Sequence, residues 1–231
     1  MKKIVFLFLC VCILGLSSCL KKKDNIGRYT DLPAIFGYTS SFQPVITVFG
    51  ESFLAPDLST DYDLNEDDAI LTSFEINFDN QPSNLYLTTS ELTYTKVEKS
   101  RAFSGGETGS SEFSAPIEGV EPYGQASNVI FIYMKHTAPS DQVFEYEMVY
   151  NYDSSTPTVY IRAKKVGEGS EPEETIRSLH AFDMRDFFAT LPKNSEDNRV
   201  TFNIKYKTGS NADDSDRYAN WSNNPLVTVV E

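Results

Sequence analysis

The sequence predicts an all-β fold built from antiparallel sheets, with one short helix. Phe and Tyr account for 16 and 13 of the 231 residues, and aromatic residues are enriched in strands. Three segments, 74–79, 144–152 and 200–207, alternate between apolar and polar residues, which places their apolar side chains on one face of a sheet. Clusters of Gly, Pro, Asn, Asp and Ser separate the segments, as expected for turns between short antiparallel strands.

Further strands are expected from short runs of apolar and β-branched residues. These runs cover 34–38, 45–49, 85–97, 129–134, 158–163 and 226–230. The run 129–134 is apolar on both faces, which is typical of a strand in the middle of a sandwich.

A short helix is expected at 183–191, where it would close one end of a sandwich. Its apolar residues recur at helical spacing: Met184, Phe187, Phe188 and Leu191. The Asp183 carboxylate can accept a hydrogen bond from the backbone amide of Arg185 or Asp186, and Pro192 ends the run.

The N-terminus has the features of a bacterial lipoprotein signal. Lys2 and Lys3 form a positive n-region, and the uncharged stretch 4–16 is too short to cross a hydrocarbon core about 30 Å thick as a helix. It ends in Leu16-Ser17-Ser18-Cys19, which resembles a lipobox. We therefore expect cleavage before Cys19 and its acylation with fatty acids such as palmitate, which would anchor the chain to the outer membrane. The sequence is consistent both with exposure at the cell surface and with retention on the periplasmic face.

The alternative for Cys19 is a free or disulfide-forming thiol beside an ordinary cleavage site. Cys10 and Cys12 lie in the segment expected to be removed, so the mature chain would keep one thiol and form no intrachain disulfide. Its stability must then come from an apolar core.

Composition divides the chain into five expected parts. These are a signal peptide at 1–18, a polar tether at 19–32, a first β domain at 33–99, a linker at 100–124 and a second β domain at 125–231. The linker is proposed because its residues are rich in Gly, Ser and Pro and poor in strand formers.

The order of these segments resembles that of the NigD-like lipoproteins, over roughly 33–231. The likeness is carried, after the lipobox, by 35–38, 45–49, 53–56, the acidic turn 65–68, the strands 70–78 and 86–97, and then 129–134 and 178–184. The resemblance implies a small OB-like β-barrel followed by a β-sandwich. It implies no reaction and no catalytic residues.

The charge of the chain argues against nucleic acid as a partner. Its formal net charge is −13, and beyond the lysines at 21–23 no cluster of Lys or Arg occurs. Binding to a phosphate backbone depends on such basic patches. The acidity is typical of a soluble, self-repelling surface.

No catalytic, cofactor or metal site is expected. The two imidazoles are His136, expected to face solvent before the turn 139–141, and His180, expected in the core or on a sheet face. Neither stands in a recognisable nucleophile motif, and the lack of mature thiols beyond Cys19 argues against structural zinc. We therefore expect a non-enzymatic protein.

Three polar segments are candidate binding sites with structural alternatives. The acidic segment 61–68 spaces carboxylates as a calcium loop does, but its sixth position is Glu66 rather than Gly and its twelfth is Thr72. A solvated acidic turn is the alternative, as it is for 213–216. Trp221, in a polar aromatic segment, could stack on a sugar or cover the end of a sandwich.

The predicted function is that of an anchored envelope lipoprotein that binds an envelope protein or a glycan. One alternative is a structural subunit of a surface appendage that donates the strand 226–230 to a neighbour. A calcium-stabilised carbohydrate-binding protein is a further alternative.

Overall fold

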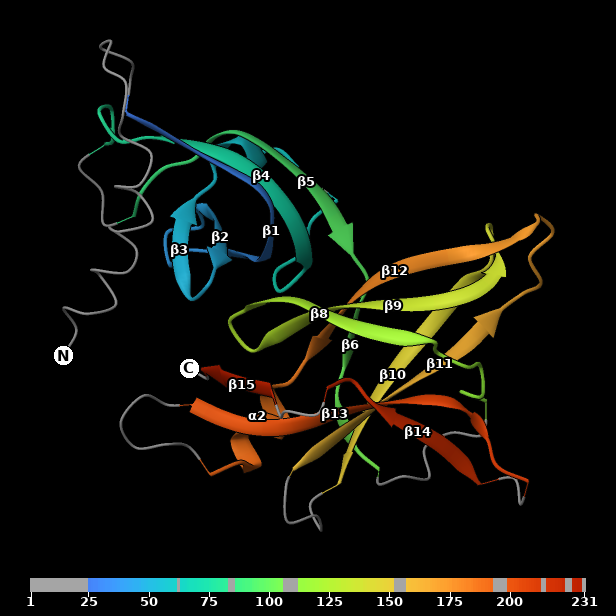
Figure 1. Cartoon of the computed structure of the whole chain (residues 1–231). Helices are drawn as coiled ribbons and strands as arrows, with labels where there is room; N and C mark the ends of the chain where they lie inside the picture. Colours follow the sequence, from blue (N-terminus) through green and yellow to red (C-terminus); the bar gives the residue numbers. More distant parts are fainter. Residues whose placement is uncertain are drawn as a thin grey trace, which may run out of the picture.

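The computed structural model describes residues 25–229, apart from 62, 83–85, 106–111, 152–156, 193–198, 213–214 and 223–225. The signal segment and Cys19 lie outside the described residues. In the described part, the chain is an all-β protein with one α-helix, which confirms the predicted fold class. No helix in this part is both long and apolar enough to span a bilayer. Figure 1 shows a curled N-terminal sheet beside a larger β-sandwich.

The N-terminal unit is a five-stranded antiparallel sheet in the order β3-β2-β1-β4-β5. Its elements are β1 (Ile26–Tyr38), β2 (Pro44–Val48), β3 (Glu51–Leu54), a 3-10 turn (Pro56–Leu58), β4 (Ala69–Asn77) and β5 (Ser90–Val97). One face buries alternate residues such as Phe36, Ile46 and Phe74 in a common apolar cluster. The predicted periodicity of two therefore decides which side chains are inside.

This unit is an open sheet rather than the closed barrel that was expected. In the described residues, an isolated parallel bridge between Leu54 of β3 and Thr88, just before β5, connects the two edges of the sheet. There the Leu54 amide donates to Leu87 O and the Thr89 amide donates to Leu54 O, both at 2.9 Å. Because β3 is four residues long, it offers little backbone for further pairing with β5.

The sandwich consists of a four-stranded and a six-stranded sheet. The first has the order β6-β12-β9-β8, with β6 (Lys99–Arg101), β8 (Gly119–Ala126), β9 (Val129–Pro139) and β12 (Glu173–Asp183). The second has the order β14-β13-β11-β10-β7, with β15 also on β13. Its strands are β7 (Phe103–Ser104), β10 (Val143–Asn151), β11 (Thr158–Val166), β13 (Arg199–Ser210), β14 (Asp216–Asn220) and β15 (Leu226–Val229).

The sandwich is mixed, whereas an antiparallel one was expected. The pairs β11–β13, β10–β7 and β12–β6 are parallel. The pair β11–β13 is parallel because β12, which lies between these strands in the chain, belongs to the opposite sheet. The chain thus crosses between sheets before it returns.

The segment 100–124, predicted as a linker, contributes strands to both sheets of the sandwich. Strands β6 and β7 are three and two residues long, too short to show a periodicity in sequence. Strand β8 contains Pro122 and Gly124 at a register shift, and it is an edge strand, where proline is tolerated. A Cβ at Gly124 would lie 2.7 Å from Pro33 Cγ, so this glycine allows β8 to pack on β1.

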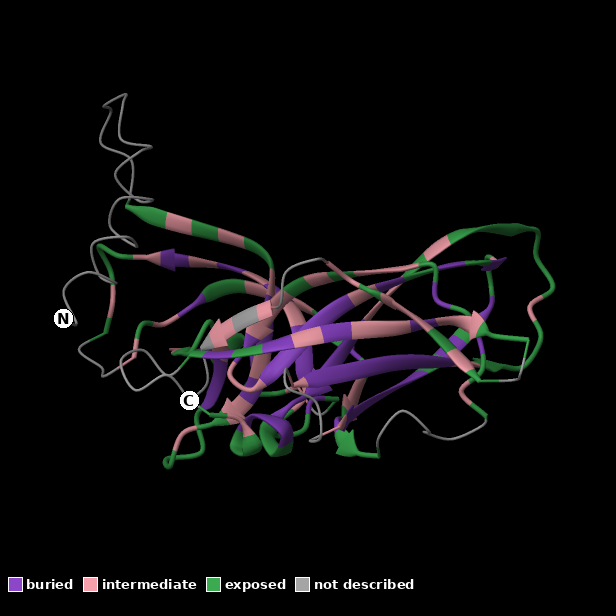
Figure 2. Cartoon of the chain, turned by 60° about the horizontal axis from the view of Figure 1, so that its bottom comes forward, coloured by how far each residue is buried: buried purple, intermediate pink, exposed green. Residues whose placement is uncertain are grey.

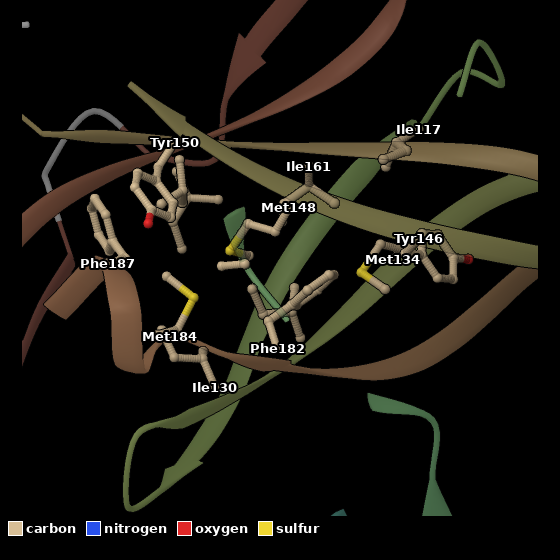
Figure 3. Close-up of a cluster of buried hydrophobic side chains, with 14 of the residues drawn as sticks. Ile117, Ile130, Met134, Tyr146, Met148, Tyr150, Ile161, Phe182, Met184 and Phe187 are labelled. Carbon is tan, nitrogen blue, oxygen red and sulfur yellow. The ribbon is translucent and has the colours of Figure 1, made fainter. Parts of the chain in front are cut away.

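The sandwich core lies between the two sheets (Figure 3). Side chains of β9, such as Met134, face Tyr146 and Met148 of β10 and Ile161 of β11 in one cluster. The strands around this core form the largest continuous buried region in Figure 2. Its helix, α2 (Arg185–Thr190), closes one end of the core with Phe187 and Phe188, as predicted.

The predicted hydrogen bond at the start of α2 is confirmed. The Arg185 backbone amide donates to Asp183 Oδ1 at 3.0 Å. The helix ends at Thr190, two residues before Pro192.

A second apolar cluster joins the two units. Strand β9 is apolar on both faces, and while Ile130 faces the sandwich core, Val129 and Phe131 face the N-terminal sheet. There they pack with Ala69 of β4 and Val97 of β5, and Phe131 is fully buried. The described parts of the two units therefore share a buried interface.

Candidate functional site

A groove of about 340 Å³ lies on the outer face of the N-terminal sheet. Residues of three strands line it, including Gly37 of β1, Thr47 of β2 and Ser52 of β3. These belong to one face because the register pairs Gly37 with Val45 and Thr47 with Ser52. The turn before β4 and Ser127 in the β8–β9 turn form its walls. In Figure 1, β8 lies below β1 and β2 at this point.

The floor of the groove is open because Gly37 has no side chain. A Cβ at this position would meet only Val45 Cγ2, at 3.9 Å. Its φ is not in the left-handed region, so the backbone does not require glycine there. Glycine inside a strand weakens it and often marks the close approach of a ligand. The sequence signal was present in the predicted strand 34–38, but the space above Gly37 became visible only in the fold.

The walls of the groove are polar and acidic. Thr47 Oγ1 and Ser52 Oγ form a hydrogen bond of 3.1 Å across β2 and β3. Glu66 is exposed, and in the described part of the chain no hydrogen bond or ion pair engages its carboxylate. The neighbouring Asp67 carboxylate pairs with Arg185 Nη2 at 3.3 Å. Lys and Arg do not occur among the described lining residues.

Exposed phenylalanines lie in the turns at both ends of β2. Phe42 is 87% exposed with a φ of 59°, and Phe49 is 66% exposed with a φ of 50°. Phe49 and Gly50 both have positive φ between β2 and β3, the pattern of a type I′ turn, which favours Asn-Gly. A non-glycine residue in this region costs about 1 kcal/mol. Local stability therefore does not explain either phenylalanine.

The acidic segment 61–68 acts as a structural turn in its described residues. Asp61 accepts hydrogen bonds from the Asp63 amide at 2.9 Å and from Tyr94 Oη at 2.6 Å. The bond to Asp61 raises the pKa of Tyr94 to about 12. Lys96 Nζ lies 2.8 Å from Asp68 Oδ2. These contacts engage the Asp61 and Asp68 carboxylates, and the described residues contain no group of three or more potential metal ligands.

The second acidic segment contributes Asp216 to a buried charge network. Arg162, whose side chain is 1% exposed, lies 3.5 Å from Glu147 and 3.4 Å from Asp216. Arg162 Nε donates to Tyr218 Oη at 2.6 Å, and Lys207 Nζ lies 2.5 Å from Asp216. Asp213 and Asp214 lie outside the described residues. The network joins β10, β11, β13 and β14 on the outer face of the six-stranded sheet.

Trp221 packs against the sandwich core. Its side chain is partly buried against that cluster, and its backbone amide donates to Ile204 O at 3.0 Å. This favours the packing interpretation of Trp221 over the sugar-stacking one.

The prediction that His136 faces solvent is wrong. Its side chain is 1% exposed, its Nδ1 lies 2.9 Å from Pro116 O, and its Nε2 lies 3.0 Å from Tyr146 Oη. The reason is that β9 continues to Pro139, so His136 falls on the same inward face as Met134 and Ala138. His180 is buried, as expected.

The fold brings Ser100 and His180 together, a pair that sequence analysis missed. Ser100 Oγ lies 2.8 Å from His180 Nε2 and donates to Tyr146 O at 3.1 Å. Because the serine proton is directed to that carbonyl, Nε2 donates to Oγ and cannot act as its base. His180 Nδ1 is 4.0 Å from Glu98, beyond hydrogen-bonding distance. The pair therefore links β6 to β10 and β12 rather than activating a nucleophile.

The buried histidines are expected to make stability depend on pH. Burial lowers the pKa of His180 to about 4, from 6.5, and also lowers that of His136. Below about pH 6.5 His180 is protonated in the unfolded chain but stays neutral in the folded chain. The free energy of unfolding therefore falls as the pH is lowered from about 6.5 to about 4. For His180 the full shift corresponds to about 3 kcal/mol.

Urea unfolding at a series of pH values would measure this loss. His180→Gln is expected to flatten the profile between pH 6.5 and 4.5, whatever its effect on absolute stability, while His136→Gln removes a smaller part. Carboxylates whose pKa is lowered by folding affect stability only at more acidic pH. An unchanged slope in His180→Gln would contradict the assignment.

Comparison with known proteins identifies the fold. No protein-family model and no curated protein matches the chain. An uncharacterized protein from Parabacteroides merdae matches with a TM-score of 0.72 and 18% identity, over 87% of this chain and 98% of that one. A NigD-like immunity protein from Bacteroides caccae matches with a TM-score of 0.50 and 8% identity, over 92% and 100%. The chain has the fold of a NigD-like protein.

The resemblance to NigD-like proteins is therefore supported at the level of the fold. A protein of unknown function from Bacteroides vulgatus gives a TM-score of 0.51 and 13% identity, over 86% of this chain and 90% of that one. None of these three is described as an enzyme. The matches cover most of this chain and nearly the whole of these two relatives.

Proposed function

We propose that this chain is a non-enzymatic lipoprotein of the bacterial envelope that is anchored through Cys19 and binds an envelope component in the groove above Gly37. The observation that carries the proposal is the glycine itself. It weakens β1, its φ does not require it, and its one effect on the surroundings is to leave space in the groove.

The form of the groove supports this role. Its volume of about 340 Å³ is in the range of ligand sites, and its described lining residues come from five separate parts of the chain. The faces of OB-like sheets are common binding surfaces, although fold alone does not decide function.

The appendage alternative has less support. Its proposed donor strand corresponds to β15, which pairs antiparallel with β13 from Leu226 to Val229 within the same chain. Donation would require this pairing to be broken. The calcium alternative has less support because protein groups engage Asp61 and Asp68.

Photo-crosslinking in intact cells tests the proposal. The full chain carries p-benzoyl-phenylalanine in place of Ser52, which is partly exposed and lines the groove on the same face as Gly37, or in place of Phe103, which is exposed in the sandwich. We expect an adduct in the membrane fraction from position 52 and not from position 103. Cys19→Ala should move the chain out of the membrane fraction.

Two glycine variants show whether the groove forms the adduct. Gly37→Thr should abolish it without lowering the thermal midpoint, because threonine favours strands and its side chain would enter the groove. Gly119→Thr is the matched control, since no atom lies within 4 Å of a Cβ there. An adduct that survives Gly37→Thr, or that forms equally at position 103, would refute binding in the groove.

A further inference from the structure

We propose that the ligand of this groove is a neutral oligosaccharide, an inference that rests on the proposed function and names its ligand class. The groove combines hydroxyl groups with a carboxylate that has no protein partner in the described chain. These groups can form hydrogen bonds with a neutral, hydroxyl-rich ligand.

Charge excludes anionic ligands. The groove contains the Glu66 and Asp67 carboxylates, and none of its described lining residues is Lys or Arg. Asp67 is compensated by Arg185 at 3.3 Å, whereas Glu66 faces solvent uncompensated by any described residue. A phosphate, sulfate or uronate would approach this negative charge, while Arg185 and Lys99, the described cations that contact Asp67, are engaged by that residue.

The position of the groove on a sheet face argues against a peptide. Peptides recognised by sheets usually add a strand at an edge, where free backbone groups give the affinity. Here the backbone of β1, β2 and β3 is already paired, with Gly37 opposite Val45 and Thr47 opposite Ser52. Side-chain hydroxyls and carboxylates are therefore the polar groups that the groove presents to a ligand.

These groups suit sugar hydroxyls. The Glu66 carboxylate can accept from two neighbouring hydroxyls, and charge-assisted bonds of this type are the strong ones. Thr47 and Ser52 can donate and accept. The Tyr38 ring contacts Phe36 at a centroid distance of 5.1 Å, on the face of β1 opposite to Gly37. The contacts that the groove offers to a ligand are therefore mainly polar.

The mass of the crosslinked adduct tests this ligand class. The adduct formed at position 52 of the full chain in cells is digested with proteinase K, and the remaining groove peptide is analysed by mass spectrometry. Mass increments of hexose, deoxyhexose or N-acetylhexosamine support the proposal. Increments of amino acids, or of uronic acid, sulfate or phosphate, overturn it while the proposed binding function stands. Absence of any adduct overturns both.

A carboxylate variant tests the role of Glu66. Glu66→Gln is expected to lower the adduct yield about tenfold or more, because it replaces a charged acceptor by a neutral amide. Glu173→Gln, at an exposed residue of β12 in the sandwich, is the matched control and should leave the yield unchanged. An equal adduct yield in Glu66→Gln and in the unmodified chain would show that the Glu66 carboxylate does not bind the ligand.

Discussion

Replacing Phe131 by Ala should destabilise the chain by about 3 to 5 kcal/mol and separate the unfolding of its two units. The ring is fully buried between β9 and the N-terminal sheet, in a small cluster that includes Ala69, Ala126 and Ala181. These three alanines have side chains too short to fill the cavity that the ring would leave. The contact that couples the two units would then be weakened.

Differential scanning calorimetry would show this as two transitions in place of one. Phe182→Ala is the matched control, because Phe182 is equally buried but lies in the sandwich core. It should lower the stability of the sandwich by a similar amount through a cavity that does not lie between the units. If both variants gave the same transition shape, the described interface would not be the coupling element.

Arg162→Ala should also cost about 3 to 5 kcal/mol, measured by urea unfolding at neutral pH. The loss has an electrostatic origin, because the Arg162 guanidinium pairs with two carboxylates, that of Glu147, which is 7% exposed, and that of Asp216. Burial raises the pKa of Asp216, but hydrogen bonds from Lys207 and Tyr218 outweigh burial and leave it below the ordinary value. Without Arg162, the carboxylates of Glu147 and Asp216 lose a cation that compensates their charge.

Arg28→Ala is the control for this prediction. The Arg28 side chain is 75% exposed and pairs with Glu75, so its removal should leave the free energy of unfolding nearly unchanged. A similar small cost for Arg162→Ala would mean that solvent reaches the network and compensates for the lost cation.

Much of the architecture follows from the sequence because alternation of apolar and polar residues is a local property. The segments 74–79, 144–152 and 200–207 all lie largely in observed strands, and the helix lies within 183–191. Two of the strands that were missed, β7 and β8, lack this signal. Strand β7 has two residues, and β8 contains a proline and two glycines and is held in place by β9 and β1.

The candidate site was hidden for a related reason. Gly37 lies inside a correctly predicted strand, yet its role depends on β2, β3 and the β8–β9 turn, which surround the space above it. Arg162 lies in another predicted strand, whose outward face would ordinarily be solvated. Residues from β10, β13 and β14 bury it instead.

The sequence by itself determined the all-β class, the inward face of the longer strands, the short helix and the expectation of a lipid anchor at Cys19. These depend on residues close together in the chain. Only the tertiary structure decided that the N-terminal sheet stays open, that β9 is buried on both sides by two different units, and that His136 lies inside. These features arise from contacts between strands far apart in sequence, whose partners no local periodicity specifies.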